Sequence, residues 1–185
     1  VPLVALLALS AVLYPPTNWD SMTYHMARVA HWMQNRSIRY YPTFVQRQNE
    51  MGPGAEYLIL LLQLVARSDR WANAVQLFAY VVNVASVGGL LRMAGLPRRL
   101  GVYAQVFVAA LPMGILQAAT TQNDLVAAAM SLAIASSSLP FLRRSTRCWT
   151  MPHVLLLAIS AAAGMLVKPR SVMSVLWVPL LGAIS

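Results

Sequence analysis

The chain has 185 residues, of which 58% are hydrophobic and 10% are charged, and its mean hydropathy is +0.59. Soluble domains carry roughly 25% charged residues, so this composition excludes an ordinary soluble domain and indicates a membrane protein. The net charge of +9 comes from 14 basic and five acidic residues, and because the basic residues lie between apolar runs, we assign them to membrane topology and not to nucleic-acid binding.

The first predicted element is the apolar run 1–14, which ends at a Pro-Pro pair. A span needs roughly 20 apolar residues, so we interpret this run as a span without its start, in an amino-terminal fragment of a longer protein. The mixed segment 15–71 follows and is expected to form a long extracytoplasmic loop. Within this loop the pattern predicts two amphipathic interfacial helices, approximately 18–35 and 55–66.

Five further apolar runs predict membrane spans, which makes the expected fold an all-α, polytopic transmembrane helical bundle in one domain. Pro112 lies inside one of these runs, and proline is tolerated in a span where neighbouring helices satisfy the carbonyl that it frees. The five predicted spans are 72–91, 101–118, 125–142, 152–167 and 171–185.

Arginines indicate the orientation of this bundle. Three lie in the loop before residue 101 and three in the loop after residue 142, and two spans separate these loops, so both are expected in the cytoplasm. Every carboxylate then emerges on the extracytoplasmic face, where we expect an active or binding site. The groups expected around that site are Asp20, Glu50, Glu56, Asp124, Lys168 and Arg170.

The predicted helix 18–35 carries an acid, a phenol, a guanidinium and an imidazole on one face. Steps of four, four and three residues separate these side chains. They are Asp20, Tyr24, Arg28 and His31. Asp20 has a second interpretation, because Thr17 and Asp20 also fit a loose capping box at the helix start. The spacing leaves capping and chemistry open, and Arg28 could equally contact lipid headgroups.

The other candidate site residues each have a structural alternative. Arg47 could grip a phosphate with its forked guanidinium or lie in a solvated loop. Glu56 could bind a metal or cap its helix. Asp124, at the start of a span, is either a functional acid or a residue favoured by the helix dipole. Lys168 is the single lysine beside 13 arginines, and it could face a phosphate or extend its ammonium to the membrane surface.

Four segments, taken in order, resemble a known family of membrane enzymes. They are PPTNWDSMTYHMARVAHWMQN, YYPTFVQRQNEMGPGAEYLI, LPMGILQAATTQNDLVAA and GMLVKPRS. Together they resemble the integral-membrane glycosyltransferases of the GT-C fold, in particular the protein O-mannosyltransferases and aminoarabinose transferases of glycosyltransferase family 39 and its relatives. The resemblance covers nearly the whole chain, as the amino-terminal half of such an enzyme.

The resemblance implies transfer of a sugar from a polyprenyl-phosphate donor to a glycan, lipid or protein acceptor, at the outer face of a membrane, here expected to be the bacterial inner membrane. Asp20 matches the expected catalytic acid of the first loop, and Asp124 matches a second acid at the outer end of a later span. The turn LVKPR takes the place of the family's LTKG-like turn, so Lys168 would contact the donor phosphate. A divalent metal ion is an open alternative for this role.

Two departures from the family pattern affect the expected substrate contacts. The family often has Lys-Pro-Pro where this chain has Met-Gly-Pro at residues 51–53, and Pro169 replaces the glycine after the lysine. Phosphate binding would then rest on Arg47 or Arg28. The candidate substrate-binding residues are Tyr24, Arg28, Arg47, Glu56 and Lys168.

Two other functions fit the composition. A polytopic transporter or lipid flippase would also gather ionisable groups at membrane depth, but such proteins usually carry charges near the middle of spans or internal repeats, and the sequence has neither. A non-catalytic assembly subunit has little need for the polar face of 18–35. Because the missing carboxyl-terminal part is expected to carry acceptor specificity, residues 1–185 alone should be inactive.

Overall fold

The computed structural model describes residues 2–142 and 151–173, and every regular element in these ranges is helical. The helices of the bundle are α1 (Pro2–Leu13), α5 (Ala74–Met93), α6 (Arg98–Ala109), α7 (Pro112–Ala118), α8 (Asp124–Leu142) and α9 (Met151–Val167). The segment between α1 and α5 forms η1 (Ser21–His25), α2 (Met26–Asn35), α3 (Arg47–Glu50), α4 (Gly54–Ala66) and η2 (Asp69–Trp71), and η3 (Pro169–Val172) follows α9.

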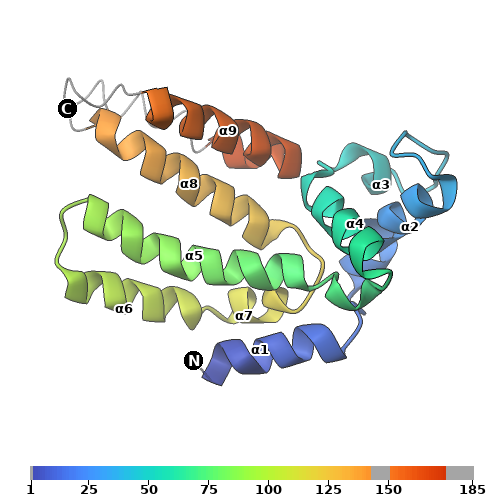
Figure 1. Ribbon diagram of the computed structural model, residues 1–185, viewed down its shortest axis with the longest axis horizontal. Coiled ribbons are helices and arrows are strands. Elements are labelled where there is room, and N and C mark those ends of the chain that lie inside the picture. Colours follow the sequence, from blue (N-terminus) through green and yellow to red (C-terminus); the bar gives the residue numbers. More distant parts are fainter. Residues whose placement is uncertain (1, 143–150, 174–185) are drawn as a thin grey trace.

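The bundle helices lie side by side with alternating direction, and α2, α3 and α4 gather at one end of them (Figure 1). Helix α5 is central, since it packs against α1, α6, α7 and α8, and α9 packs on α8. The connections between α1 and α5, the α7–α8 loop and the end of α9 therefore meet at the same end. This arrangement agrees with the alternation that the sequence predicts for 72–91, 125–142 and 152–167; most of the predicted span 171–185 lies outside the described residues.

The predicted span 101–118 is wrong as a continuous helix. It divides into α6 and α7, which are bent by 62°, with Leu111 in an extended conformation and proline as the first residue of α7. Proline cannot donate a backbone hydrogen bond and breaks a helix at this point. The Tyr80 hydroxyl donates a hydrogen bond of 2.6 Å to the carbonyl of Ala109, which satisfies one acceptor at the break.

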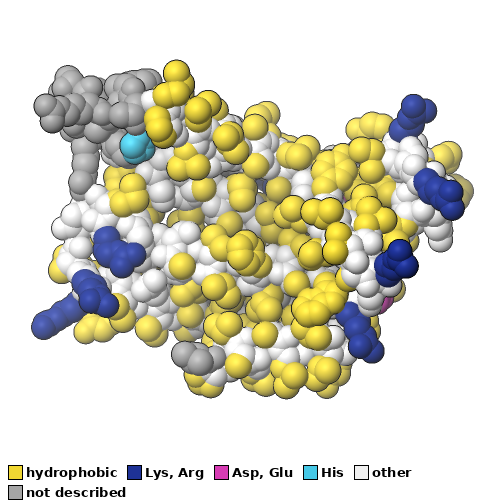
Figure 2. Space-filling view, in the orientation of Figure 1, with side chains coloured by type: hydrophobic (Ala, Val, Ile, Leu, Met, Phe, Trp, Pro, Cys, Tyr) yellow, Lys and Arg dark blue, Asp and Glu magenta, His cyan; other side chains and the backbone are white. Residues whose placement is uncertain are grey.

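Among the described residues, the stretch Asp69–Met93 is the one helix long and apolar enough to cross a membrane, and α6 with α7 makes a second if the bent pair is one span. Helices α1, α4, α9 and α8 as far as Leu139 are shorter apolar helices. Large hydrophobic side chains on α1, α5, α6 and α9 are exposed. In Figure 2 hydrophobic atoms cover the middle of the molecule, and lysine and arginine side chains gather toward its two ends.

The segment 18–35 is not the single α-helix that the sequence predicts. The π-helical turn Ser21–His25 interrupts it, between the α-helical residues 19–20 and α2, which begins at Met26. A π-turn has i to i+5 bonds and adds residues per turn, so side chains spaced by four residues no longer share one face. Asp20, at its start, makes no capping hydrogen bond with its side chain. His31 lies on another surface, stacked on Tyr41 with ring centroids 4.2 Å apart.

Glycines bring the loop before α4 into direct contact with the end of α9. A Cβ atom added at Gly52 would lie 2.5 Å from the Leu166 carbonyl oxygen and 2.6 Å from that of Val167. We expect Gly52→Ala to lower the free energy of unfolding by about 1–3 kcal/mol, because backbone would have to shift. A Cβ at Gly89 on α5 meets nothing within 4 Å, so Gly89→Ala is the matched control and should raise stability by about 0.5–1 kcal/mol.

Thermal unfolding of the two variants in the same detergent checks this expectation. Equal midpoints for Gly52→Ala and the unmodified protein would show that the contact between the loop and α9 is not close-packed.

Candidate functional site

A fully buried acid–base cluster joins the π-turn to α4. The Nδ1 atom of His25 lies 2.7 Å from Oε1 of Glu56, and a guanidinium nitrogen of Arg28 lies 3.5 Å from the same oxygen. None of the three residues is more than 1% exposed. In the contact between His25 and Glu56, the two outer atoms, His25 Nε2 and Glu56 Oε2, have no hydrogen-bond partner among the described residues. Buried charges are tolerated where they are paired, so this cluster fixes η1 and α2 against α4.

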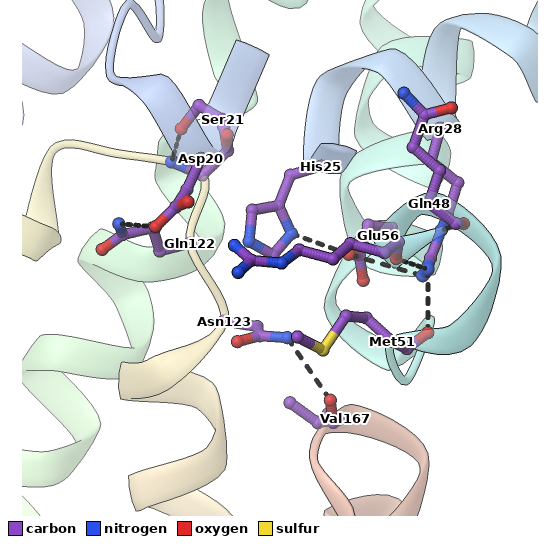
Figure 3. A network of polar contacts seen from close by, with 12 residues as sticks. Asp20, Ser21, His25, Arg28, Gln48, Met51, Glu56, Gln122, Asn123 and Val167 are labelled. Atoms are coloured by element: carbon purple, nitrogen blue, oxygen red, sulfur yellow. Dashed lines mark hydrogen bonds and ion pairs between the residues drawn. The ribbon is translucent and has the colours of Figure 1, made fainter. Parts of the chain in front are cut away.

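Arg28 also holds the short helix α3 in place. Its Nε donates to the carbonyl of Gln48, and its Nη2 donates to the carbonyls of Arg47 at 3.0 Å and Met51 at 2.8 Å. The carbonyl of Arg47 also accepts the backbone amide of Met51 at 3.3 Å, and short helices leave other carbonyls at their ends for side-chain donors such as Arg28. Figure 3 shows Arg28 beside Gln48, Met51 and Glu56. The guanidinium is therefore buried and held by protein through Nε and Nη2, while its Nη1 has no hydrogen-bond partner among the described residues.

Gln48 fixes α3 to the π-turn from the other side. Its side-chain amide donates to the carbonyl of Thr23 at 2.7 Å, and its Oε1 accepts from the hydroxyls of Tyr41 and Thr43 at 3.1 and 2.9 Å. These three bonds use both acceptor positions and one of the two donors of the amide, and they fix the π-turn at Thr23, next to Tyr24.

The π-turn contacts the α7–α8 loop through its first residues. Gln122 donates to Oδ2 of Asp20 at 3.1 Å, and the backbone amide of Thr121 donates to the hydroxyl of Ser21 at 3.3 Å. Figure 3 shows Asp20 turned toward Gln122, away from the cluster of His25 and Glu56. A neutral amide is the one hydrogen-bond partner recorded for this half-buried carboxylate among the described residues, so Asp20 keeps an oxygen available to accept a proton.

Asp124, the second predicted acid, has a different environment. Its Oδ1 forms an ion pair with Nζ of Lys168, and the two side chains are 45% and 31% exposed. Gln117 contacts the other carboxylate oxygen at 3.5 Å. The neighbouring Asn123 donates to the carbonyl of Val167 at 3.4 Å, which brings the start of α8 to the end of α9. An acid that neutralises a lysine is less suited to accept a proton than one beside an amide.

Tyr24 lies where the charges of the site meet. Burial, followed by the negative charges of Asp20, Asp124 and Glu56, raises the pKa of Tyr24 to about 12, against the opposite effect of Arg47. The guanidinium carbon of Arg47 lies 6.0 Å from the centroid of the Tyr24 ring. The exposed side chain of Arg47 is thus close to the phenol, in the same part of the site as the two aspartates.

The raised pKa of Tyr24 has a consequence for stability at alkaline pH. Between about pH 10 and pH 12 the unfolded chain has lost the phenol proton and the folded chain retains it, so stability should fall as pH rises. We expect Tyr24→Phe to lose part of this pH dependence. Denaturant unfolding at a series of pH values checks it, with Tyr103→Phe as the control at an exposed phenol. The same slope in both variants would contradict the prediction.

The described residues form no preassembled site for a metal ion. No group of three histidine, cysteine, aspartate or glutamate side chains converges among residues 2–142 and 151–173. Asp124 is already paired with an ammonium, and Asp20 is bonded to an amide.

The predicted site residues thus divide into two groups. Asp20, Tyr24, Arg47, Asp124 and Lys168 lie around one end of the bundle, as the sequence predicts. Arg28 and Glu56 are also at this end, but each is buried in contacts with protein. Sequence reasoning missed His25, Gln48 and Gln122, whose partners are 31, 25 and 102 residues away. A weak signal existed for His25, since it lies four residues after Ser21 and three before Arg28.

Comparison with protein-family models, with curated proteins and with solved structures gives no match.

Proposed function

We propose that this chain is part of a membrane glycosyltransferase that moves a sugar from a polyprenyl-phosphate donor to an acceptor at the extracytoplasmic face. The observation that carries the proposal is the gathering of Asp20, Tyr24, Arg47 and the Asp124–Lys168 pair at one end of an apolar helical bundle. In the proposed membrane orientation this end lies at the membrane surface, where a lipid-linked phosphate can meet an acceptor that arrives from water.

The proposed reaction forms one bond and breaks one bond at the anomeric carbon. An acceptor hydroxyl oxygen attacks this carbon, its proton passes to the carboxylate of Asp20, and the bond from the anomeric carbon to the phosphate oxygen breaks. The polyprenyl phosphate leaves with the electron pair of that bond. A positioned general base and a cationic partner for the leaving group are the two aids that this chemistry needs.

Arg47 and Lys168 are the proposed partners of the leaving phosphate. Arg47 is exposed and close to Tyr24, so its guanidinium can turn to a phosphate that approaches Asp20. The ion pair with Asp124 orients Lys168 at the end of α9. Asp124 accordingly acts on the reaction through Lys168, and Asp20 is the proposed base.

The membrane setting supports the same proposal. The bundle presents exposed hydrophobic side chains along α1, α5, α6 and α9, with arginines at both ends, and soluble proteins rarely expose apolar surface on this scale. The end with Arg92, Arg98 and Arg99 has no acid among the described residues, so we place it in the cytoplasm and the site outside, in a bacterial inner membrane.

The test uses the full-length protein in proteoliposomes with a panel of labelled polyprenyl-phosphate sugars. We expect release of label from the lipid with at least one donor, and none from liposomes that lack the protein. Intact label with every donor would contradict the proposal.

One observation favours a transporter or lipid flippase instead. Helices α6 and α7 form a bent pair at Pro112, and broken helices are typical of transporter binding sites. Polar amides of α5, at Gln76 and Asn83, bond backbone atoms of the α8 start inside the bundle. The same proteoliposomes can test this function with a fluorescent polyprenyl phosphate, because movement between leaflets without cleavage would identify a flippase.

A further inference from the structure

A cavity separate from Asp20 opens on the outer side of α3. Its volume is about 200 Å³, and α2, α3 and α4 line it together with the connecting loops and Pro169. Cavities for drug-sized ligands measure roughly 300–1,000 Å³, so this one is suited to a single small ring. The side chains that matter for its chemistry are Trp32, Arg39, Tyr40, Asn49, Glu50 and Tyr57.

Aromatic rings form one wall of the cavity. Trp32 is buried and stacks on Tyr57 with centroids 5.1 Å apart, and the guanidinium of Arg28 lies 5.8 Å from the Trp32 centroid on the same ring system. Trp32 is therefore fixed, and it supports Tyr57 in a set orientation. Tyr40 also lines the cavity and is 84% exposed, so its ring is accessible to a ligand.

The polar groups of the cavity include both hydrogen-bond donors and hydrogen-bond acceptors. The exposed carboxylate of Glu50 accepts hydrogen bonds and the exposed guanidinium of Arg39 donates them. The amide nitrogen of Asn49 is held by the carbonyl of Tyr41 at 2.8 Å, which fixes the side chain and leaves its oxygen as an acceptor. The guanidiniums of Arg28 and Arg39 and the carboxylate of Glu50 all line the cavity, so inorganic phosphate is the ligand that has to be tested against a neutral one.

A saccharide ring matches this combination. Its C–H faces are apolar and lie flat against aromatic rings, and its hydroxyl groups both donate and accept hydrogen bonds at the ring edge. Pockets of this kind combine aromatic walls with a few fixed polar groups.

The cavity shares its inner wall with the catalytic end of the bundle. Arg28 and Gln48 line it, and Gln48 bonds the carbonyl of Thr23, next to Tyr24. Pro169 also lines it and directly follows Lys168. Gln48 and Pro169 therefore connect a ring bound here to the segments that carry Tyr24 and Lys168.

We propose that this cavity is a subsite for one monosaccharide unit of the acceptor, so that the acceptor is a glycan. The proposal rests on the proposed glycosyltransferase function, and it adds the chemical class of the second substrate and the residues that hold it.

The first test measures binding alone and does not depend on transfer. Saturation-transfer NMR would follow methyl glycosides of glucose, galactose and mannose with the full-length protein in nanodiscs. We expect saturable binding of at least one glycoside, weakened about tenfold or more by Tyr40→Ala, since a stacking face is lost. Phe44→Ala is the matched control, because Phe44 is fully exposed in the same loop and does not line the cavity.

Each outcome of this test decides the proposal. No saturable binding to any glycoside overturns it, and so does binding that Tyr40→Ala leaves unchanged. Inorganic phosphate is the competing probe, and displacement of the glycoside signal by phosphate at equal concentration would identify an anion site instead. Glu50→Gln is a second variant at an exposed position. It should weaken glycoside binding, because the charged acceptor is lost.

A second measurement separates this proposal from the glycosyltransferase function. With a donor that is turned over, the glycoside should accelerate label release. Tyr40→Ala should raise the KM for the glycoside, and the control Phe44→Ala should leave this KM unchanged. If no donor is turned over, the function proposed above fails, and the NMR result still decides whether the cavity binds saccharides.

Discussion

Asp20→Asn is expected to lower donor turnover by about 10²–10⁴-fold, the usual contribution of a positioned general base. The substitution preserves the shape of the side chain and its contact with Gln122, so a loss of activity would come from the loss of the proton acceptor. Release of labelled sugar from a polyprenyl-phosphate donor, measured at saturating acceptor, checks this expectation.

Asp69→Asn is the matched control for this experiment. Asp69 is an exposed carboxylate of the same loop, in the short turn η2, and it has no place in the proposed chemistry. Its variant should retain full turnover. If Asp20→Asn also retains full turnover, Asp20 is not the base, and Asp124→Asn becomes the informative variant despite the ion pair with Lys168.

The largest expected effect on stability comes from Glu56→Gln. This change removes the negative charge that faces His25 and Arg28 in a buried cluster. Breaking a buried pair on one side costs about 3–5 kcal/mol, because the remaining charge has no compensation. Denaturant unfolding in micelles, followed by tryptophan fluorescence, checks the loss.

Glu50→Gln makes the same chemical change at an exposed position of α3, and its effect should stay within about 0.5 kcal/mol. A double-variant cycle with Arg28→Met tests whether the two side chains act together. We expect the double variant to be about 0.5–3 kcal/mol more stable than additivity requires. Additive losses would show that Glu56 and Arg28 stabilise the loop independently.

The apolar runs predicted the helices well because burial and lipid contact both require long hydrophobic stretches. The run 72–91 corresponds to Ala74–Met93, and 152–167 to Met151–Val167. The break at Pro112 was not predicted as a bend, since the sequence alone does not show whether neighbours let a proline continue a span. The membrane placement of these helices stays a prediction.

The sequence predicted that the candidate site residues gather at one end of the bundle, but it did not predict which side chains contact one another; their role in a site stays a prediction. Alternation of the helices was enough to place Asp20, Asp124 and Lys168 at one end. The π-turn changed the contacts of 18–35, because face assignments assume 3.6 residues per turn. The partnership of His25 with Glu56 depends on how α4 packs against α2, and spacing along the chain carries no information on that packing.

The contact of Gly52 and Gly54 with the end of α9 bears on the order of events during biosynthesis. The amino-terminal loop is synthesised long before α9, and chains generally fold in the order in which they emerge. Until α9 has been synthesised and packed, the turn before α4 lacks the surface on which it packs, and Asp124 lacks its ion pair with Lys168. The loop therefore reaches its final shape only at a late stage of translation, and a ribosome-stalled chain that ends before α9 should be digested by protease within residues 36–53, where the longer chain resists.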